Sequence, residues 1–254
     1  MTSLVQFDVL NPATTDSPTM TTSKTARTAR LILLRHGQAS LGTEDYDRLS
    51  DLGKKQAQAL SQRLAAARML DSPVVAGSLN RQQQTLELLA SSGSAKTDES
   101  LNEYTVDQLI RSTVEQAGEL GIKVPDERAF ADPQAYLRTF LEWFPTVLSL
   151  WQSARLRCAH NGLWSDFHAR VTSPIAGWSE HLRSGCSLVV VSSAGVISTV
   201  VSEMLGKELA WQRDLNVRLY NASLTELSLD ANGRWQAGRI NCVEHLKPDA
   251  VTLA

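Results

Sequence analysis

The stretch Leu31-Ile32-Leu33-Leu34-Arg35-His36-Gly37-Gln38 passes from four apolar residues directly into polar residues and a glycine. A short apolar run that ends in this way is typical of a buried strand in a parallel sheet. Ligands of open α/β sheets bind beyond the carboxyl ends of the strands, so Arg35 and His36 are predicted to face a ligand. The alternative is an Arg-His pair in a surface loop.

The same pair of residues suits chemistry at phosphorus. An arginine can bind phosphoryl oxygens with two parallel N–H groups, and a neighbouring histidine nitrogen can attack the phosphorus atom. Gly37 would allow the backbone to approach the ligand closely. We therefore interpret Arg35 as a phosphoryl-binding group and His36 as a candidate nucleophile.

Strands and helices alternate along the chain, which predicts an α/β fold with helices on both faces of a sheet. Residues 104–183 are mostly helical in pattern. Alternating residues on both sides of Asn232-Gly233 predict a closing hairpin, and hence an antiparallel strand at one edge. The other expected elements are strands at 31–34, 73–76 and 187–191 and helices at 50–68, 82–90 and up to about 205.

Composition excludes several classes of protein. The 254 residues carry 25 basic and 27 acidic side chains, so a net charge of −2 favours neither nucleic acid nor an anionic membrane as a partner. No apolar stretch approaches the ~18 residues that a membrane helix needs. Three scattered cysteines and histidines without ligand spacing predict no disulfides, no metal and no other cofactor. We expect a reducing, cytoplasmic location.

Residues 1–29 differ from the rest of the chain. Residues 11–28 are rich in Thr, Ser, Pro and Ala and show no hydrophobic period, which is typical of a disordered tail. They lack the basic start and apolar middle of a secretory signal. An organelle-targeting segment is an alternative, and Met20 is an alternative start. Residues 30–254 are predicted to form one domain with a helical insertion at about 104–183; the oligomeric state is left open.

Two further charged residues follow predicted extended segments. Arg81 comes after the strand at 73–76, in the turn Gly77-Ser78-Leu79-Asn80-Arg81, and would be a second phosphate-binding arginine. Glu103 follows Leu101-Asn102 and could protonate a leaving alkoxide. The alternative for both residues is ordinary surface charge.

Taken together, these fragments resemble the histidine phosphatase superfamily, also called the phosphoglycerate mutase-like family. The resemblance covers roughly residues 31–246. It rests on the order and spacing of five fragments: LLRHG at 33–37, LGKKQA at 52–57, SLNR at 78–81, LNE at 101–103 and VVVSSAG at 189–195.

The resemblance implies a fold and a mechanism. The family's fold is a three-layer α/β/α sandwich with a mostly parallel sheet and a helical insertion over the site. His36 would be phosphorylated by a small phosphorylated substrate and then release phosphate to water. Arg35 and Arg81 would hold the phosphoryl group, Glu103 would donate the proton, and Gly37 and Gln38 would lie in the substrate-binding segment.

One departure from the family affects the charge of the site. Ser193 stands where the family has its second active-site histidine, in Ser192-Ser193-Ala194-Gly195. A serine hydroxyl can donate one hydrogen bond but carries no charge, whereas amides at the following helix start can still hold an anion. The loss of one preorganised donor typically costs on the order of 10²–10³ in rate.

Three functions therefore stay open. The first is a metal-independent phosphomonoester hydrolase that acts through a phosphohistidine on His36. The second is a catalytically weak or inactive protein of the same fold that binds phosphorylated ligands. The third is a phosphoglycerate mutase-type phosphotransferase, which is less favoured because Gly42 stands where the mutases carry an asparagine.

Overall fold

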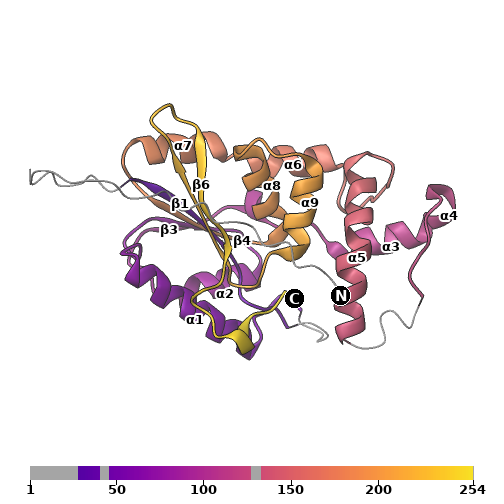
Figure 1. Cartoon of the computed structure of the whole chain (residues 1–254), viewed down its shortest axis with the longest axis horizontal. Helices are drawn as coiled ribbons and strands as arrows, with labels where there is room; N and C mark the ends of the chain where they lie inside the picture. Colours follow the sequence, from indigo (N-terminus) through magenta and orange to yellow (C-terminus); the bar gives the residue numbers. More distant parts are fainter. Residues whose placement is uncertain (1–27, 41–45, 127–132, 254) are drawn as a thin grey trace, which may run out of the picture.

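The computed structural model describes residues 28–40, 46–126 and 133–253 (Figure 1). Most of the predicted tail at 1–29, including Met20, lies outside these residues, and so does Gly42. Within the described part of the chain, no helix is both long enough and apolar enough to cross a membrane.

A six-stranded sheet forms the centre of the structure, in the order β3-β2-β4-β1-β5-β6. The strands β1, β2, β3 and β4 run parallel to one another. β5 pairs antiparallel with both β1 and β6. The predicted antiparallel strand is therefore β5, which is second from the edge of the sheet that β6 forms. The strands are β1 Arg30–Arg35, β2 Val74–Ala76, β3 Ala95–Thr97, β4 Leu188–Ser192, β5 Leu224–Leu229 and β6 Trp235–Cys242.

Alternate residues of the central strands enter two separate cores. Ile32 and Leu34 of β1 pack with α1 and α2, whereas Leu31 and Leu33 pack with α7 and α8 on the other face. This period of two is what a strand buried on both faces requires. The three-layer α/β/α sandwich is therefore confirmed. Its helices are α1 Asp51–Ala66, α2 Asn80–Leu88, α7 Ile175–Arg183, α8 Ala194–Met204 and α9 Leu209–Arg218.

The predicted helical insertion lies beside the sheet, where α3, α4 and α5 extend to the right in Figure 1. The longest helix, α5, carries the buried side chains of Phe144, Val147, Leu148 and Trp151 on one face. Pro145 lies inside this helix. The helices of the insertion are α3 Val106–Glu115, α4 Ala117–Leu120, α5 Pro133–Gln152 and α6 Trp164–Thr172, preceded by the 3-10 helix η1 Glu99–Leu101. The predicted range 104–183 also included α7, which packs on the sheet instead.

Two elements were not expected from the sequence. β3 is three residues long and exposed, so it has no apolar pattern. α9 buries Gln212 and Asn216 beside Leu215, and a helix whose buried face contains amides shows no clear apolar period. The Gln212 side chain instead donates hydrogen bonds to Ser198 and Thr199 of α8, at 2.8 and 3.2 Å.

A close backbone contact holds the end of β1 against α1. A Cβ atom on Gly37 would overlap the carbonyl of Gly53, and a Cβ atom on Gly53 would overlap the carbonyl of Gln38. The helix begins at this point because the hydroxyl of Ser50, its N-cap, accepts from the Gly53 N–H at 3.0 Å. Both glycines are thus required by packing.

We expect Gly37→Ala to destabilise the protein by about 1–3 kcal/mol, because the new methyl group meets backbone that cannot move away. Urea unfolding followed by tryptophan fluorescence measures this change. Gly177→Ala is the matched control: Gly177 lies within α7, has open space around it, and should be unchanged or slightly stabilised. Equal stability of the two variants would contradict the packing argument.

Candidate active site

The strands β1, β2 and β4 are parallel, so their carboxyl ends lie at the same end of the sheet, where they border a cavity of about 600 Å³. Five of the seven predicted site residues line it: Arg35, His36, Arg81, Glu103 and Ser193. The backbone sets this arrangement, because the His36 N–H donates to the Ser192 carbonyl at 2.9 Å and extends the β1–β4 pairing by one residue. The residues therefore converge from distant parts of the sequence.

His36 is held with one ring nitrogen facing the cavity. Its Nδ1 lies 2.7 Å from the Gly37 carbonyl oxygen, which can only accept, so Nδ1 carries the proton. The other nitrogen, Nε2, then accepts from Arg81 Nε at 3.2 Å. Burial, followed by the charges of Arg81 and Arg35, holds the pKa of His36 well below its usual value. The imidazole is therefore neutral, and its Nε2 lone pair accepts from Arg81.

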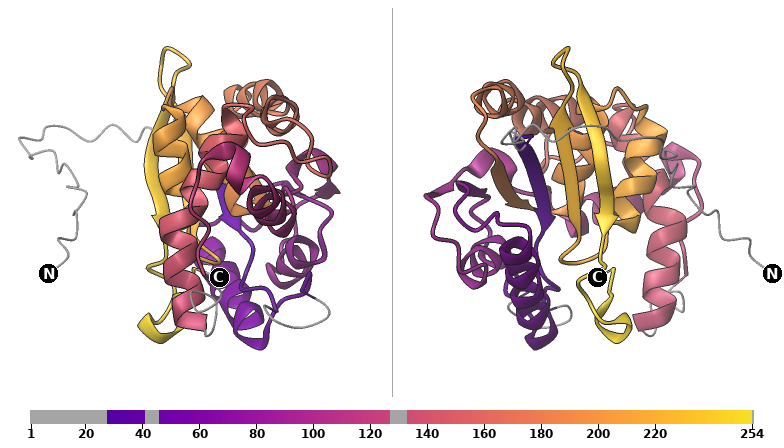
Figure 2. Two further views of the ribbon diagram at one scale, coloured as in Figure 1. Left: turned by 90° about the vertical axis from the view of Figure 1, so that its right-hand side faces the viewer. Right: turned by 60° about the vertical axis from the view of Figure 1, so that its left-hand side comes forward.

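Arg35 has a buried donor without a partner. Its Nη1 donates to the carbonyls of Leu219 and Leu253, the second at 2.8 Å, whereas its buried Nε donates to no atom. Figure 2 shows the C-terminal segment that carries Leu253 between α1 and α5. Burial lowers the pKa of Arg35 to about 10, so the guanidinium remains charged. A buried cation with an unused donor favours an anion in the cavity.

Arg81 is fixed from two sides at the start of α2. Its Nη1 forms an ion pair with Asp47 Oδ1 at 2.5 Å, and its guanidinium lies over the ring of Tyr46, 5.5 Å from the centroid. Only 8% of Arg81 is exposed. The two contacts hold its Nε against His36.

Glu103 lies at the amino end of α8. Its Oε2 accepts from the Gly195 N–H at 2.6 Å, and its Oε1 accepts from the Tyr104 N–H at 3.2 Å. Burial raises the pKa of Glu103, although these amides and the two arginines oppose the shift. A side chain at Gly195 would overlap both Glu103 and Tyr104, so the glycine is required here. A carboxyl group with a raised pKa can act as a proton donor.

Ser193 is fixed by a residue that sequence reasoning missed. Gln82 Nε2 donates to Ser193 Oγ at 2.9 Å and to the Leu101 carbonyl at 3.2 Å, while Gln82 Oε1 accepts from the Leu79 N–H at 3.3 Å. The Leu101 and Leu79 contacts fix the orientation of the amide, so Ser193 Oγ is used as an acceptor. The hydroxyl proton of Ser193 is left to donate elsewhere.

Gly37 and Gln38 are not among the residues that line the cavity. Gly37 is required by its close approach to Gly53, not by an approach to the ligand, and its N–H donates to Thr85 Oγ1 at 3.1 Å. The Gln38 side chain turns toward α1, where its Oε1 accepts from the Ser50 hydroxyl at 2.9 Å. Neither residue therefore lies where the predicted contact with substrate would place it.

Further polar residues of the cavity were not predicted, among them Tyr104, Asn216 and Asn221. Asn216 Nδ2 donates to the Tyr104 hydroxyl at 2.8 Å, which links α9 to the loop that carries Glu103. Asn221 precedes β5, whose start is held at the end of β1 by a bond from the Ala222 N–H to the His36 carbonyl at 3.0 Å. Only the antiparallel pairing of β5 could have indicated that Asn221 belongs here.

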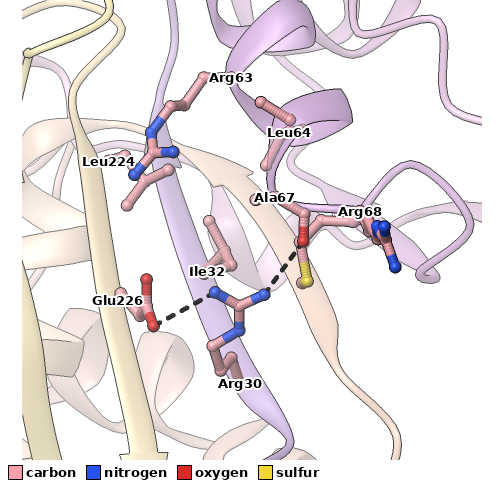
Figure 3. Close-up of a pocket in the computed structure, with 10 residues that line it drawn as sticks. Arg30, Ile32, Arg63, Leu64, Ala67, Arg68, Leu224 and Glu226 are labelled. Carbon is pink, nitrogen blue, oxygen red and sulfur yellow. Dashed lines mark hydrogen bonds and ion pairs between the residues drawn. The ribbon is translucent and has the colours of Figure 1, made fainter. Parts of the chain in front are cut away.

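A second pocket, of about 320 Å³, lies at the opposite end of β1. Figure 3 shows Arg30 between Glu226, at 3.5 Å, and the carbonyl of Ala67, at 3.3 Å. None of the predicted site residues lines this pocket. Three arginines do, Arg30, Arg63 and Arg68, and Arg30 is paired with Glu226. The site at the carboxyl ends of the strands is therefore the stronger candidate.

Neither pocket carries an evident metal centre. Across the described ranges, no group of three or more His, Cys, Asp and Glu side chains is placed to hold a metal ion. The three cysteines are free, and one of them, Cys158, is buried. The expected cytoplasmic location stays a prediction.

The sequence matches one family model, described as histidine phosphatase superfamily (branch 1), over residues 31–139 and 126–243. No curated protein sequence matches the chain.

Solved structures of similar fold come from several organisms. The product of an open reading frame of Mycobacterium tuberculosis has a TM-score of 0.58 at 19% identity, covering 85% of this chain and 99% of its own. A mycobacterial glucosyl-3-phosphoglycerate phosphatase has a TM-score of 0.58 at 20% identity, covering 85% and 100%. A phosphoserine phosphatase variant of Entamoeba histolytica in complex with phosphoserine has a TM-score of 0.56 at 16% identity, covering 86% and 100%. At these identities the likeness concerns the fold.

We expect Gln82→Met to weaken the binding of inorganic phosphate by about 0.5–1.5 kcal/mol, because Ser193 would lose the donor that orients its hydroxyl. Calorimetric titration with phosphate measures the change. The control is Ser193→Ala. Adding Gln82→Met to this variant should cause no further loss of phosphate affinity. Additive losses in the double variant would show that Gln82 does not act through Ser193.

Proposed function

The chain belongs to the histidine phosphatase superfamily (branch 1), and from this premise we propose that it hydrolyses phosphomonoesters through a phosphohistidine on His36, without a metal. The observation that carries the proposal is the neutral His36 ring, whose Nε2 accepts from Arg81 inside the cavity. The contact places an unprotonated nucleophile beside a cation that can bind the phosphoryl oxygens.

In the first step, His36 Nε2 attacks the phosphorus atom and the bond from phosphorus to the alcohol oxygen breaks. Arg81 Nε–H turns from His36 to a phosphoryl oxygen, and the unpartnered Nε of Arg35 binds another. Glu103 gives its proton to the departing oxygen. The products of this step are the free alcohol and a phosphohistidine.

In the second step, water attacks the phosphohistidine. The Glu103 carboxylate takes a proton from the water as the phosphorus–nitrogen bond breaks, which returns Glu103 to its protonated form and His36 to its neutral form. Ser193 completes the binding of the phosphoryl group, since the Gly195 N–H at the start of α8 already donates to Glu103. Inorganic phosphate then leaves.

Ser193 also supports a second candidate, a weakly active or inactive protein that binds phosphorylated ligands. A neutral hydroxyl replaces a group that the family uses to neutralise the phosphoryl charge. Arg35 and Arg81 would still bind a phosphate ester, so binding and turnover must be measured separately.

Release of inorganic phosphate from a panel of phosphomonoesters, without added metal, tests the proposal. His36→Ala should lower the rate by roughly 10³-fold or more, because it removes the nucleophile. His168→Ala is the matched control, since this histidine lies outside the cavity on α6, and it should keep the wild-type rate. Turnover that survives in His36→Ala excludes the phosphohistidine, whereas phosphate binding without turnover in the wild type supports the second candidate.

Glu103→Gln should act in a way that depends on the leaving group. For an alkyl phosphate we expect a loss of about 10²–10⁴-fold in rate, because the alkoxide needs the proton. For 4-nitrophenyl phosphate the rate of the first step should fall only slightly, since nitrophenolate leaves without protonation. An equal loss for both substrates in single-turnover phosphorylation would exclude Glu103 as the proton donor.

The lowered pKa of His36 and the raised pKa of Glu103 also predict an acidic pH optimum for kcat/KM. Activity requires neutral His36, which its lowered pKa maintains into acid, and protonated Glu103, whose raised pKa extends this form to higher pH. Activity on an alkyl phosphate should therefore fall as the pH rises through the pKa of Glu103. A rate that instead rises steadily from acid to alkaline pH would contradict these assignments.

A further inference from the structure

Beyond the phosphoryl-binding end, an aromatic surface lines the cavity. Phe140 and Phe144 lie one turn apart on α5, with ring centroids 4.5 Å apart and planes inclined by 17°. The ring of Tyr104 lies 6.5 Å from Phe144, inclined by 28°. Because Phe144 and Tyr104 are only 1% and 6% exposed, Phe140 is the most exposed of these three rings. Leu137 of α5 and Val106 at the start of α3 border it.

Charge is distributed unevenly in the same cavity. Among the described residues that line it, the only arginines are Arg35 and Arg81, there is no lysine, and His36 is the only histidine. All three lie where the phosphoryl group is proposed to bind. Of the carboxyl groups that line the cavity, Glu103 is the proposed proton donor, Asp47 is paired with Arg81, and Asp107 is an exposed residue in the first turn of α3.

This distribution disfavours a second anionic group on the substrate. A carboxylate in the leaving group would lie against aromatic and aliphatic side chains, with Asp107 as its charged neighbour. A buried carboxylate without a cationic partner is strongly disfavoured, whereas an uncharged ring gains from the burial of its apolar surface. The cavity has the size typical of small-molecule sites, which leaves room for such a ring.

We propose that the preferred substrates are phosphomonoesters of uncharged, apolar alcohols that carry an aromatic ring, with the ring against Phe140 and the neighbouring Leu137 and Val106. The inference rests on the proposed phosphatase function, because it places the phosphoryl group at His36. It disfavours the phosphoglycerate mutase alternative, whose substrate carries a carboxylate.

Three esters with similar alkyl leaving groups test this preference: 3-phenylpropyl phosphate, propyl phosphate and 3-phosphonooxypropanoate. The value of kcat/KM should be roughly 10- to 100-fold higher for the phenylpropyl ester than for the propyl ester, the range expected from burial of a ring. The carboxylate ester should fall below the propyl ester. A carboxylate ester that is hydrolysed as fast as the phenylpropyl ester, or faster, overturns the proposal.

Two variants locate the preference in the structure. Phe140→Ala should reduce the ratio of kcat/KM between the phenylpropyl and propyl esters by at least about threefold, because it removes part of the apolar surface. Val114→Ala is the matched control: Val114 is an exposed residue of α3, and this variant should keep the ratio. A ratio unchanged in Phe140→Ala contradicts the assigned surface.

Asp107→Lys should raise kcat/KM severalfold for the carboxylate ester alone, since a cation would then face the leaving group. Lack of this gain would argue against the placement of the leaving group beside Asp107. The proposed function fails in a different way: no phosphate is released from any of the three esters or from 4-nitrophenyl phosphate. That result overturns the substrate preference together with the phosphatase assignment.

Discussion

One backbone hydrogen bond, from the His36 N–H to the Ser192 carbonyl, determines where the candidate site forms. It extends the parallel pairing of β1 with β4 just beyond the last residues of the strands. The carbonyl of His36 is bound in turn by the Ala222 N–H, two residues before β5. His36 is therefore held by its backbone between two neighbouring strands, while its ring points into the cavity. The glycine that follows lets α1 pack directly against this segment, so the candidate nucleophile is attached to the most buried part of the sheet.

The electrostatics of the site follow from this position. Burial, and after it the charges of Arg81 and Arg35, lower the pKa of His36, which favours the neutral ring that a nucleophile requires. The same arginines favour the ionised form of Glu103, but burial has the larger effect and raises its pKa. In the proposed mechanism the cavity supplies a neutral imidazole and a carboxyl group with a raised pKa, which is the combination that cleavage of an alkyl phosphate requires. In the proposed mechanism the positive charges of Arg35 and Arg81 bind the phosphoryl oxygens.

The sequence predicted the central part of this structure because those features are local. The apolar run at 31–34, the valine-rich strand and the arginine after β2 are read directly from neighbouring residues, and parallel pairing brings their ends together. Long-range contacts were not predictable in this way. Gln82 reaches Ser193 across 111 positions of sequence, and Asn216 lies on a helix that buries amides. Gln38 follows the motif in sequence, yet its side chain turns toward α1 because the chain bends there.

The most direct test of the account is rapid-quench mass spectrometry of the protein during turnover of 4-nitrophenyl phosphate. The account predicts an acid-labile phosphoryl group on His36 that forms at least as fast as turnover and is absent from His36→Ala. Turnover of the wild-type protein without any such adduct, or an adduct on another residue that persists in His36→Ala, would contradict it.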